Sequence, residues 1–305
     1  RGDNDNEFDN KEIIKEMLRL RKEKAALMGF NSHSEYVLDN TMAKTPENVN
    51  ELLQTMWKPG IEKAKGEVKA MQDLIHNEGG NYNLAAWDWW YYSEKLRQQQ
   101  FNFTEEEVKP YFSEDKVLQG AFEVANKLFD ITFTESEDLP KYRDNIRSFI
   151  VKDNDEKVIG IFYTDYTLRP NKGGGAWMNT FRSQSKFNGE IIPLVVNVCN
   201  FPPPNSDGVS LLSFEQVETL FHEFGHGLHG LLSDAQYPSL SGTSVTRDYV
   251  EFPSQMMENW AREPAVIKTF AKHYKTGEII PDDLLEKFSA AGKFNEGFAT
   301  TEYIA

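Results

Sequence analysis

The sequence predicts a mainly α-helical chain with a small central β-sheet. Apolar residues recur at a spacing of about 3.6 residues through most of roughly the first 130 positions, which is typical of amphipathic helices. Between residues 146 and 200 the pattern changes to short β-branched runs that are separated by polar or glycine-rich turns, as in strands. Helical spacing returns after Pro202–Pro204. We therefore expect a helical region at 1–145, a sheet region at 146–212 and a second helical region at 213–305, all within one domain.

Three segments of the N-terminal region have a helical pattern. Lys11–Leu27 is the first and Leu84–Gln100 is the third. The second has Thr45 as its N-cap and Pro46 in its first turn, and we expect Pro59 to break or kink it. The aromatic residues of the third segment are expected to be buried between helices, with a ligand-stacking wall as the alternative. They are Trp87, Trp89, Trp90, Tyr91 and Tyr92.

The middle of the chain contains several candidate strands. Ser148–Val151 and Val158–Tyr163 flank a polar turn and predict a hairpin, and Ala176–Phe181 and Ile191–Cys199 follow. We expect roughly three to five short strands in one small sheet. The glycines at 173–175 form either a plain turn or a place where another backbone comes close. They are no phosphate loop, because no Gly-Lys-Ser/Thr ending accompanies them.

Composition excludes several classes of partner. The 305 residues include 48 acidic and 33 basic side chains, and a net charge of -15 argues against nucleic acid and anionic membranes. The single cysteine, Cys199, leaves no internal disulfide and no cysteine-based metal cage. No apolar run approaches the roughly 20 residues that cross a bilayer, and the first residues are no signal peptide. We expect a soluble, cytoplasmic monomer. Both ends look cut, so a periplasmic or exported protein stays an alternative.

The candidate chemistry lies on one predicted helix. Ser213 and Gln216 form a capping-box start. The apolar residues that follow share one stripe of this helix, and three of the six histidines of the chain lie on the opposite side. These histidines are His222, His226 and His229.

The residues from His222 to His226 read HEFGH, an HExxH motif. Histidines at positions i and i+4 lie one turn apart and can direct two imidazole nitrogens at one Zn²⁺. Glu223 is rotated off that axis, where it can hold a water instead of the metal. Glycines cost about 1 kcal/mol each inside a helix, so this helix needs a close approach of other backbone or ligand to justify three of them. They are Gly225, Gly227 and Gly230. A solvated helix face that carries two histidines by chance is the alternative.

A catalytic zinc site needs a third protein ligand and an open position. His229 is one candidate, but one helix would then supply all three ligands, and hydrogen bonding beside the site suits it better. Glu251 is the first glutamate beyond the helix, and Pro253 fits the first turn of a new helix there. Glu258 and Asp248 are candidate partners for the imidazole N–H groups. For Glu258, a plain surface carboxylate is the alternative.

The block FHEFGHGLHGLLSDAQYPSLSGTSVTRDYVEFPSQMMENW resembles the active-site block of the thimet oligopeptidase family of zinc peptidases. The segments GGGAWMNTFR, PLVVNVCNF and SGTSVTRDYVEFPSQ are most similar to the bacterial peptidyl-dipeptidases, or dipeptidyl carboxypeptidases, of that family. RGDNDNEFDNKEI, DNTMAKTPENV and AAWDWWYYSEKLR extend the resemblance over nearly the whole chain. One departure is Tyr142–Ile146, where relatives often carry a His in a Tyr/Trp-His-x-Asp-Val segment.

The resemblance implies a role for each matching residue. It makes His222, His226 and Glu251 the ligands of one zinc ion, with Glu223 as the general base. It also implies a two-lobed, mostly helical zincin with a deep channel that admits short peptides. In related zincins a strand edge above the metal pairs with the substrate backbone, and Gly174–Ala176 (Gly174, Gly175 and Ala176) match that stretch.

The expected activity is zinc-dependent hydrolysis of short peptides, with release of C-terminal dipeptides. An endo-acting oligopeptidase of the same family is one alternative. A peptide-binding fragment without turnover is the other, because the resemblance also implies that an N-terminal helical lobe and a Tyr- and His-bearing substrate loop lie outside this sequence.

Overall fold

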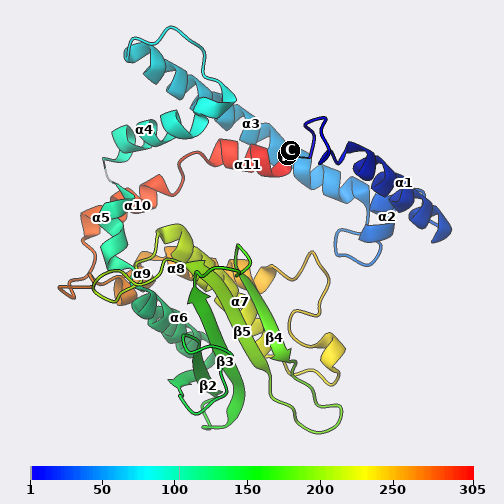
Figure 1. The fold of residues 1–305 in the computed structure, drawn as a ribbon, viewed down its shortest axis with the longest axis vertical. Coiled ribbons are helices and arrows are strands. Elements are labelled where there is room, and N and C mark those ends of the chain that lie inside the picture. Colours follow the sequence, from blue (N-terminus) through cyan, green and yellow to red (C-terminus); the bar gives the residue numbers. More distant parts are fainter. Residues whose placement is uncertain (1, 103) are drawn as a thin grey trace. The chain divides into compact units, whose positions relative to one another are not determined.

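The computed structural model of the chain describes residues 2–102 and 104–305 (Figure 1). The chain divides into two compact units. The first holds the chain up to Ala70 together with Thr246–Tyr249 and Asn295–Ala305, and the second holds Met71–Val245 and Val250–Phe294. The HEFGH motif lies in the second unit. The boundaries expected at 145 and 212 stay a prediction.

The first unit is helical. Its elements are α1 (Lys11–Leu27), α2 (His33–Leu38), most of α3 (Pro46–Asn77) and α11 (Glu296–Ile304). The start of α3 at Pro46 is as expected. Of the break or kink expected at Pro59, the break is wrong, because α3 continues through that residue as one helix, and the kink stays a prediction. A proline removes a single i to i−4 hydrogen bond, and the other bonds of this 32-residue helix hold the turns on both sides.

Most of the helices of the chain lie in the second unit. They are α4 (Trp89–Phe101), α5 (Glu105–Val108), α6 (Glu114–Phe129), α7 (Phe214–Leu231), α8 (Phe252–Arg262), α9 (Pro264–Phe270) and α10 (Asp282–Ala291). Short 3₁₀ turns occur at Ala86–Asp88, Lys109–Tyr111 and Pro238–Leu240. Within the described residues, we find no helix with the length and apolar character that a bilayer span requires.

The aromatic residues at the start of α4 divide between two faces. Trp89 and Tyr92 are each 7% exposed, as expected for a buried helix face. Trp87, Trp90 and Tyr91 are 85%, 69% and 61% exposed, so the expectation that the whole cluster is buried is wrong. Helical geometry explains the division, because only residues three or four apart share a face.

The strands form one five-stranded mixed sheet, which confirms the expected small sheet. They are β1 (Thr132–Glu135), β2 (Arg147–Lys152), β3 (Val158–Thr167), β4 (Trp177–Arg182) and β5 (Leu194–Phe201). Their order is β1-β2-β3-β5-β4, and only β3 and β5 are parallel. The predicted hairpin is the β2–β3 pair, in which Ile150 lies opposite Ile161. β4 is therefore an edge strand.

The main core lies between one face of this sheet and the helices α6 and α7 (Figure 1). Four phenylalanine rings join the three elements. Phe122 of α6 stacks on Phe133 of β1 with 4.1 Å between ring centroids, and Phe162 of β3 meets Phe224 of α7 at 5.6 Å. Phe224 therefore anchors α7, the helix that carries the HEFGH motif, against the sheet.

A buried carboxylate lies near the end of β3. Asp165 is 2% exposed, and its oxygens accept hydrogen bonds from Tyr142 (2.7 Å), from both terminal nitrogens of Arg169 and from Lys172 (3.0 Å). Burial raises the pKa of Asp165, but the hydrogen bonds from Arg169, Tyr142 and Lys172 outweigh it and lower the pKa to about 2. Tyr142, in the segment that departs from the family pattern, therefore has a structural partner.

We expect Asp165 to stabilise the fold at neutral pH and to lose this effect in acid. Its folded pKa of about 2 lies below the unfolded value of about 3.9, so its contribution is present above about pH 4 and is lost as the pH falls toward 2. The contribution is roughly 2 kcal/mol of the free energy of unfolding. Urea unfolding of the protein and of Asp165→Asn measures it. A difference between the two proteins that stays constant with pH would contradict the prediction.

Candidate metal centre

The helix α7 begins at the predicted capping box. The Ser213 Oγ accepts a hydrogen bond from the Gln216 amide (3.2 Å), and the Gln216 Oε1 accepts one from the Ser213 amide (2.9 Å). The apolar stripe of α7 is buried as expected. It consists of Val217, Leu220, Phe221, Phe224, Leu228 and Leu231. This stripe anchors α7 in the main core.

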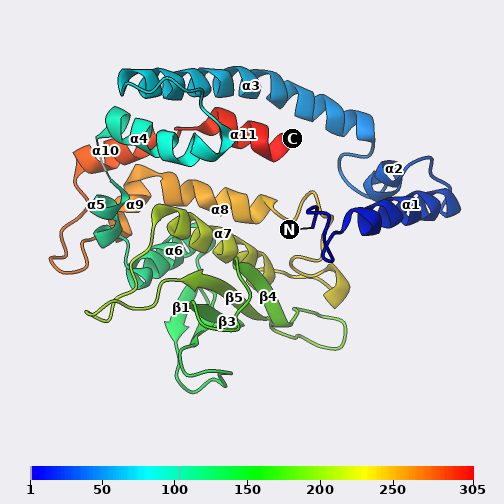
Figure 2. The ribbon, with the colours of Figure 1, turned by 45° about the horizontal axis from the view of Figure 1, so that its top comes forward.

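Gly225 allows α7 and α8 to approach closely, and Figure 2 shows the two helices side by side. A Cβ atom on Gly225 would lie 2.6 Å from the Pro253 carbonyl oxygen and 2.7 Å from the Ser254 Cα. Such distances leave room for a hydrogen atom only. The close approach of another backbone, which the three glycines predicted, is confirmed at Gly225. Its consequence is that Glu251, just before α8, comes beside the histidines of α7.

The other two glycines of α7 face the sheet. A Cβ on Gly227 would lie 3.2 Å from the Asn197 Oδ1 of β5, and one on Gly230 would lie 2.7 Å from the Met178 Cε of β4 and 3.1 Å from the Val195 Cγ2 of β5. The helix therefore lies directly against β5 and the edge strand β4.

We expect Gly225→Ala to destabilise the protein by roughly 1–3 kcal/mol, because the added methyl group must push α8 away. Thermal unfolding measures the loss. Gly66→Ala in α3 is the matched control, since among the described residues no atom outside the adjoining residues and nearby backbone of α3 lies within 4 Å of its added Cβ, and alanine is the better helix former. A loss at Gly225 no larger than that at Gly66 would show that the contact between the helices is not tight.

His222, His226 and Glu251 bring three possible ligand atoms together. The Glu251 Oε2 lies 3.2 Å from the His222 Nε2 and 3.1 Å from the His226 Nε2. Among the described residues this is the group of histidine, cysteine and carboxylate side chains that could hold a metal ion, with all three ligand atoms within 4.8 Å of one another. Two imidazole nitrogens and one carboxylate oxygen suit zinc. The Glu251 side chain is 51% exposed, so the group opens to solvent.

Two further side chains orient this group. The His222 Nδ1 lies 2.6 Å from the Glu258 Oε1, so Glu258 takes the imidazole-partner position predicted for it. The Ser254 hydroxyl donates a hydrogen bond to the Glu251 Oε2 at 2.8 Å. Ser254 is fully buried and was not among the predicted site residues. Its only sequence signal is a serine three residues after the glutamate in the first turn of a helix.

The remaining predicted site residues are not among the three candidate ligands. His229 is half-buried one turn after His226 on α7, and burial lowers its pKa. Asp248 belongs to the first unit, where its Oδ2 accepts hydrogen bonds from the backbone amides of Met42 (2.7 Å) and Ala43 (3.1 Å). Its expected role as an imidazole partner stays a prediction. Gly174–Ala176 lie in the connection that leads into β4.

Glu223 is buried beside the histidines. It is 6% exposed, and within the described residues its Oε2 has no hydrogen-bond partner. Burial raises the pKa of Glu223 to about 7, and the nearby Glu251 carboxylate adds to this effect against the opposing influence of His222. A carboxylate with a pKa near neutrality can both accept and donate a proton.

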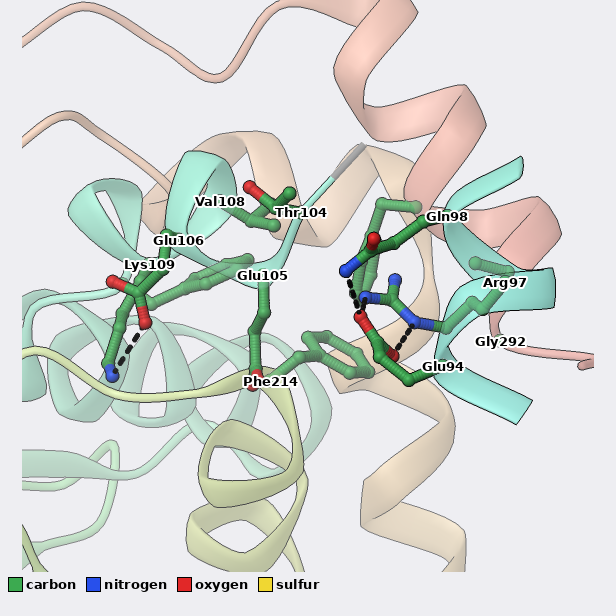
Figure 3. A pocket seen from close by; sticks show the side chains of 13 residues that line it. Glu94, Arg97, Gln98, Thr104, Glu105, Glu106, Val108, Lys109, Phe214 and Gly292 are labelled. Carbon is green, nitrogen blue, oxygen red and sulfur yellow. Dashed lines mark hydrogen bonds and ion pairs between the residues drawn. The ribbon is translucent and has the colours of Figure 1, made fainter. Parts of the chain in front are cut away.

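A pocket of about 520 Å³ lies in another part of the second unit (Figure 3). Its polar side chains bond to one another, since the Glu94 carboxylate accepts hydrogen bonds from Arg97 (2.7 Å) and Gln98 (2.8 Å). Phe214, at the start of α7, forms part of its apolar wall. The pocket contains none of the ligand candidates, so we assign no chemistry to it.

Two histidines one turn apart, an intervening glutamate and a carboxylate from the next helix are typical of metallopeptidases. The comparison with protein families agrees, because the model of Peptidase family M3 matches residues 1–305. The chain belongs to Peptidase family M3. This match confirms the resemblance found in the sequence.

Three relatives illustrate the range of the family. The dipeptidyl carboxypeptidase of Salmonella typhimurium (strain LT2) is 39% identical over 305 residues, which are 100% of this chain and 45% of the relative. Oligopeptidase A of Escherichia coli (strain K12) is 37% identical, with 96% of this chain and 44% of the relative covered. The mitochondrial intermediate peptidase of Yarrowia lipolytica is 32% identical, with 90% and 39% covered. The chain spans less than half the length of these relatives.

Proposed function

We propose that His222, His226 and Glu251 hold one zinc ion in a peptidase that hydrolyses short peptides, with Glu223 as its general base. The observation that carries this proposal is the convergence of the Glu251 Oε2 on both imidazole Nε2 atoms within 3.2 Å. When bound, zinc supplies a Lewis acid that polarises the peptide carbonyl and lowers the pKa of a water.

The partners of the ligands prepare them for the metal. Glu258 accepts the N–H of the His222 Nδ1, which leaves the lone pair of Nε2 free to bind. Ser254 donates to the Glu251 Oε2 and so limits the rotation of that carboxylate. These hydrogen bonds reduce the conformational freedom that the side chains lose when a metal binds.

Glu223 moves the proton in the proposed reaction. Its carboxylate accepts a proton from the water that attacks the scissile carbonyl, and it then donates this proton to the leaving amine as the C–N bond breaks. Both steps need only that the carboxylate is ionised before the attack and protonated after it.

We propose further that the second unit forms the core of a zincin, that a deep channel admits only short peptides and that Gly174–Ala176 pair with the substrate backbone. The products would be C-terminal dipeptides, which the name of the Salmonella relative supports. Endo cleavage is the second candidate, favoured by the 37% identity to an oligopeptidase. We also propose a cytoplasmic monomer, and the net charge of -15 argues against nucleic acid and anionic membranes as its partners.

Elemental analysis together with product analysis tests the proposal. We expect one zinc per chain, and dipeptides from a peptide with a free C-terminus but not from the same peptide with an amidated C-terminus. Internal cleavage of both peptides would establish the oligopeptidase instead. Bound zinc with no cleavage would leave a peptide-binding protein, and absence of zinc would refute the metal assignment.

A further inference from the structure

The connection between β3 and the edge strand β4 is held by two polar side chains that have no role in the chemistry above. It spans residues 168–176 and includes the glycines at 173–175. In the described part of the sheet β4 pairs only with β5, so its other edge can accept an extended peptide. The inference below rests on the proposed function, in which a substrate pairs with the start of this strand.

Lys172 joins the connection to the ends of two strands. Its Nζ donates to the Asp165 Oδ1 (3.0 Å) and to the backbone carbonyls of Asp165 (2.8 Å), Thr167 (3.1 Å) and Cys199. Asp165 and Thr167 belong to β3, and Cys199 belongs to β5. The Lys172 side chain is only 3% exposed, so its ammonium group depends on these oxygens in place of water.

Asn200 holds the glycines themselves. Its Nδ2 donates to the carbonyl oxygens of Gly173 (2.7 Å) and Gly175 (2.8 Å). Gly175 has a φ of +80°, and apart from the adjoining residues no atom of the described residues lies within 4 Å of a Cβ placed on Gly174 or Gly175. Packing therefore contributes little to the position of these glycines, and the hydrogen bonds from Asn200 fix it.

The register of the sheet brings the start of β4 level with the HEFGH turn. Gly227 of α7 lies against Asn197 of β5, and Gly230 lies against Val195. A step of two residues toward the C-terminus of β5 therefore corresponds to a step of three residues toward the N-terminus of α7. By this spacing Cys199 comes level with Phe224, the residue after Glu223 in the HEFGH motif. The electrostatic effects agree, because after burial the largest influence that raises the pKa of the Cys199 thiol is the charge of Glu223.

The strand β4 extends this register to the connection. Trp177 of β4 lies opposite Val198 of β5, so the residues before Trp177 continue beside Cys199 and Asn200. The backbone of Gly175 and Ala176 therefore lies level with the HEFGH segment of α7 along the sheet.

We propose that Lys172 and Asn200 are positioning residues. They hold the backbone of Gly173–Ala176 at the level of Glu223, and this backbone in turn holds the substrate peptide in register with the proposed catalytic group. Neither side chain touches the substrate. Their effect belongs to peptide binding and not to metal binding.

Asn200→Ala is the sharper test, because Asn200 is partly exposed and its loss leaves no buried charge. We expect KM for a pentapeptide with a free C-terminus to rise roughly tenfold with little change in kcat. A tenfold rise corresponds to the loss of one or two hydrogen bonds to the peptide backbone, and these bonds form in the ground state and the transition state alike. In a Glu223→Gln background, the Kd for the same peptide should rise by the same factor. Lys172→Met should act in the same direction, and Lys157→Met, which removes an exposed lysine near the start of β3, is the matched control.

Amide hydrogen exchange provides a readout that needs neither zinc nor turnover. In Asn200→Ala, the amides of residues 173–176 should exchange faster while those of α7 stay unchanged. Unchanged KM and Kd in an active Asn200→Ala protein would overturn the proposal. A loss of zinc or of thermal stability in Asn200→Ala that accounts for the whole rise in KM and Kd would also overturn it. If the unmodified protein neither binds nor cleaves the peptide, the proposed function fails, and the exchange data alone decide whether Asn200 fixes the glycines.

Discussion

Replacing Glu223 with glutamine is expected to lower kcat for peptide hydrolysis by about 10²–10⁴-fold and to leave the zinc content unchanged. Glutamine has nearly the same shape as glutamate, but it cannot accept the proton of the attacking water. Glu223 also lies outside the group of three ligand atoms formed by His222, His226 and Glu251. The loss should therefore be confined to turnover. Steady-state kinetics beside elemental analysis of the same preparation measures both quantities.

Glu215→Gln is the matched control for this substitution. Glu215 lies in the first turn of the same helix, its side chain is exposed and it is remote from the ligand atoms. We expect activity close to that of the unmodified protein. A Glu223→Gln protein that retains zinc and near-normal kcat would remove Glu223 from the role of general base, and one that loses zinc would indicate that the carboxylate supports the metal instead.

Local sequence patterns predicted the helix that carries the site. The capping box at Ser213 and the HEFGH spacing depend only on residues three or four apart, and helix geometry determines how such residues lie. Glu251 could be named as a candidate third ligand for a different reason, because few carboxylates follow the HEFGH motif. The clash that a Cβ on Gly225 would make with Pro253 explains why glycine is required where the two helices meet.

Features that depend on distant parts of the chain were not predictable in the same way. Asp165 contacts Tyr142, a residue of the segment before β2, only in the folded chain, and no spacing in the sequence indicates this contact. The exposure of Trp90 depends on which face of α4 meets a neighbour, which composition does not reveal. The sequence does not indicate a role for Ser254, because a serine in the first turn of a helix is common. Only the hydrogen bond from its hydroxyl to Glu251 distinguishes it.

Replacing Glu251 with alanine is expected to weaken zinc binding more than replacing any other carboxylate of the site. Glu251 offers an oxygen within 3.2 Å of both imidazole Nε2 atoms, so its loss would leave two protein ligands where a catalytic zinc needs three. Glu258 acts only through the Nδ1 of His222, and loss of such a partner typically costs about 10–100-fold in metal affinity. Glu251→Ala should therefore exceed 100-fold, and Glu258→Ala should fall within that range.

Competition with a chelator of known affinity ranks the variants without any need for turnover. Asp234→Ala is the matched control, because Asp234 is an exposed carboxylate paired with Lys186 and it should bind zinc as the unmodified protein does. Ser254→Ala should weaken binding less than Glu251→Ala, since the carboxylate remains and loses only one hydrogen bond. If Glu258→Ala proves more damaging than Glu251→Ala, then Glu258 is the third ligand and Glu251 is its outer partner, which would require the His222 ring to present its Nδ1 to the metal.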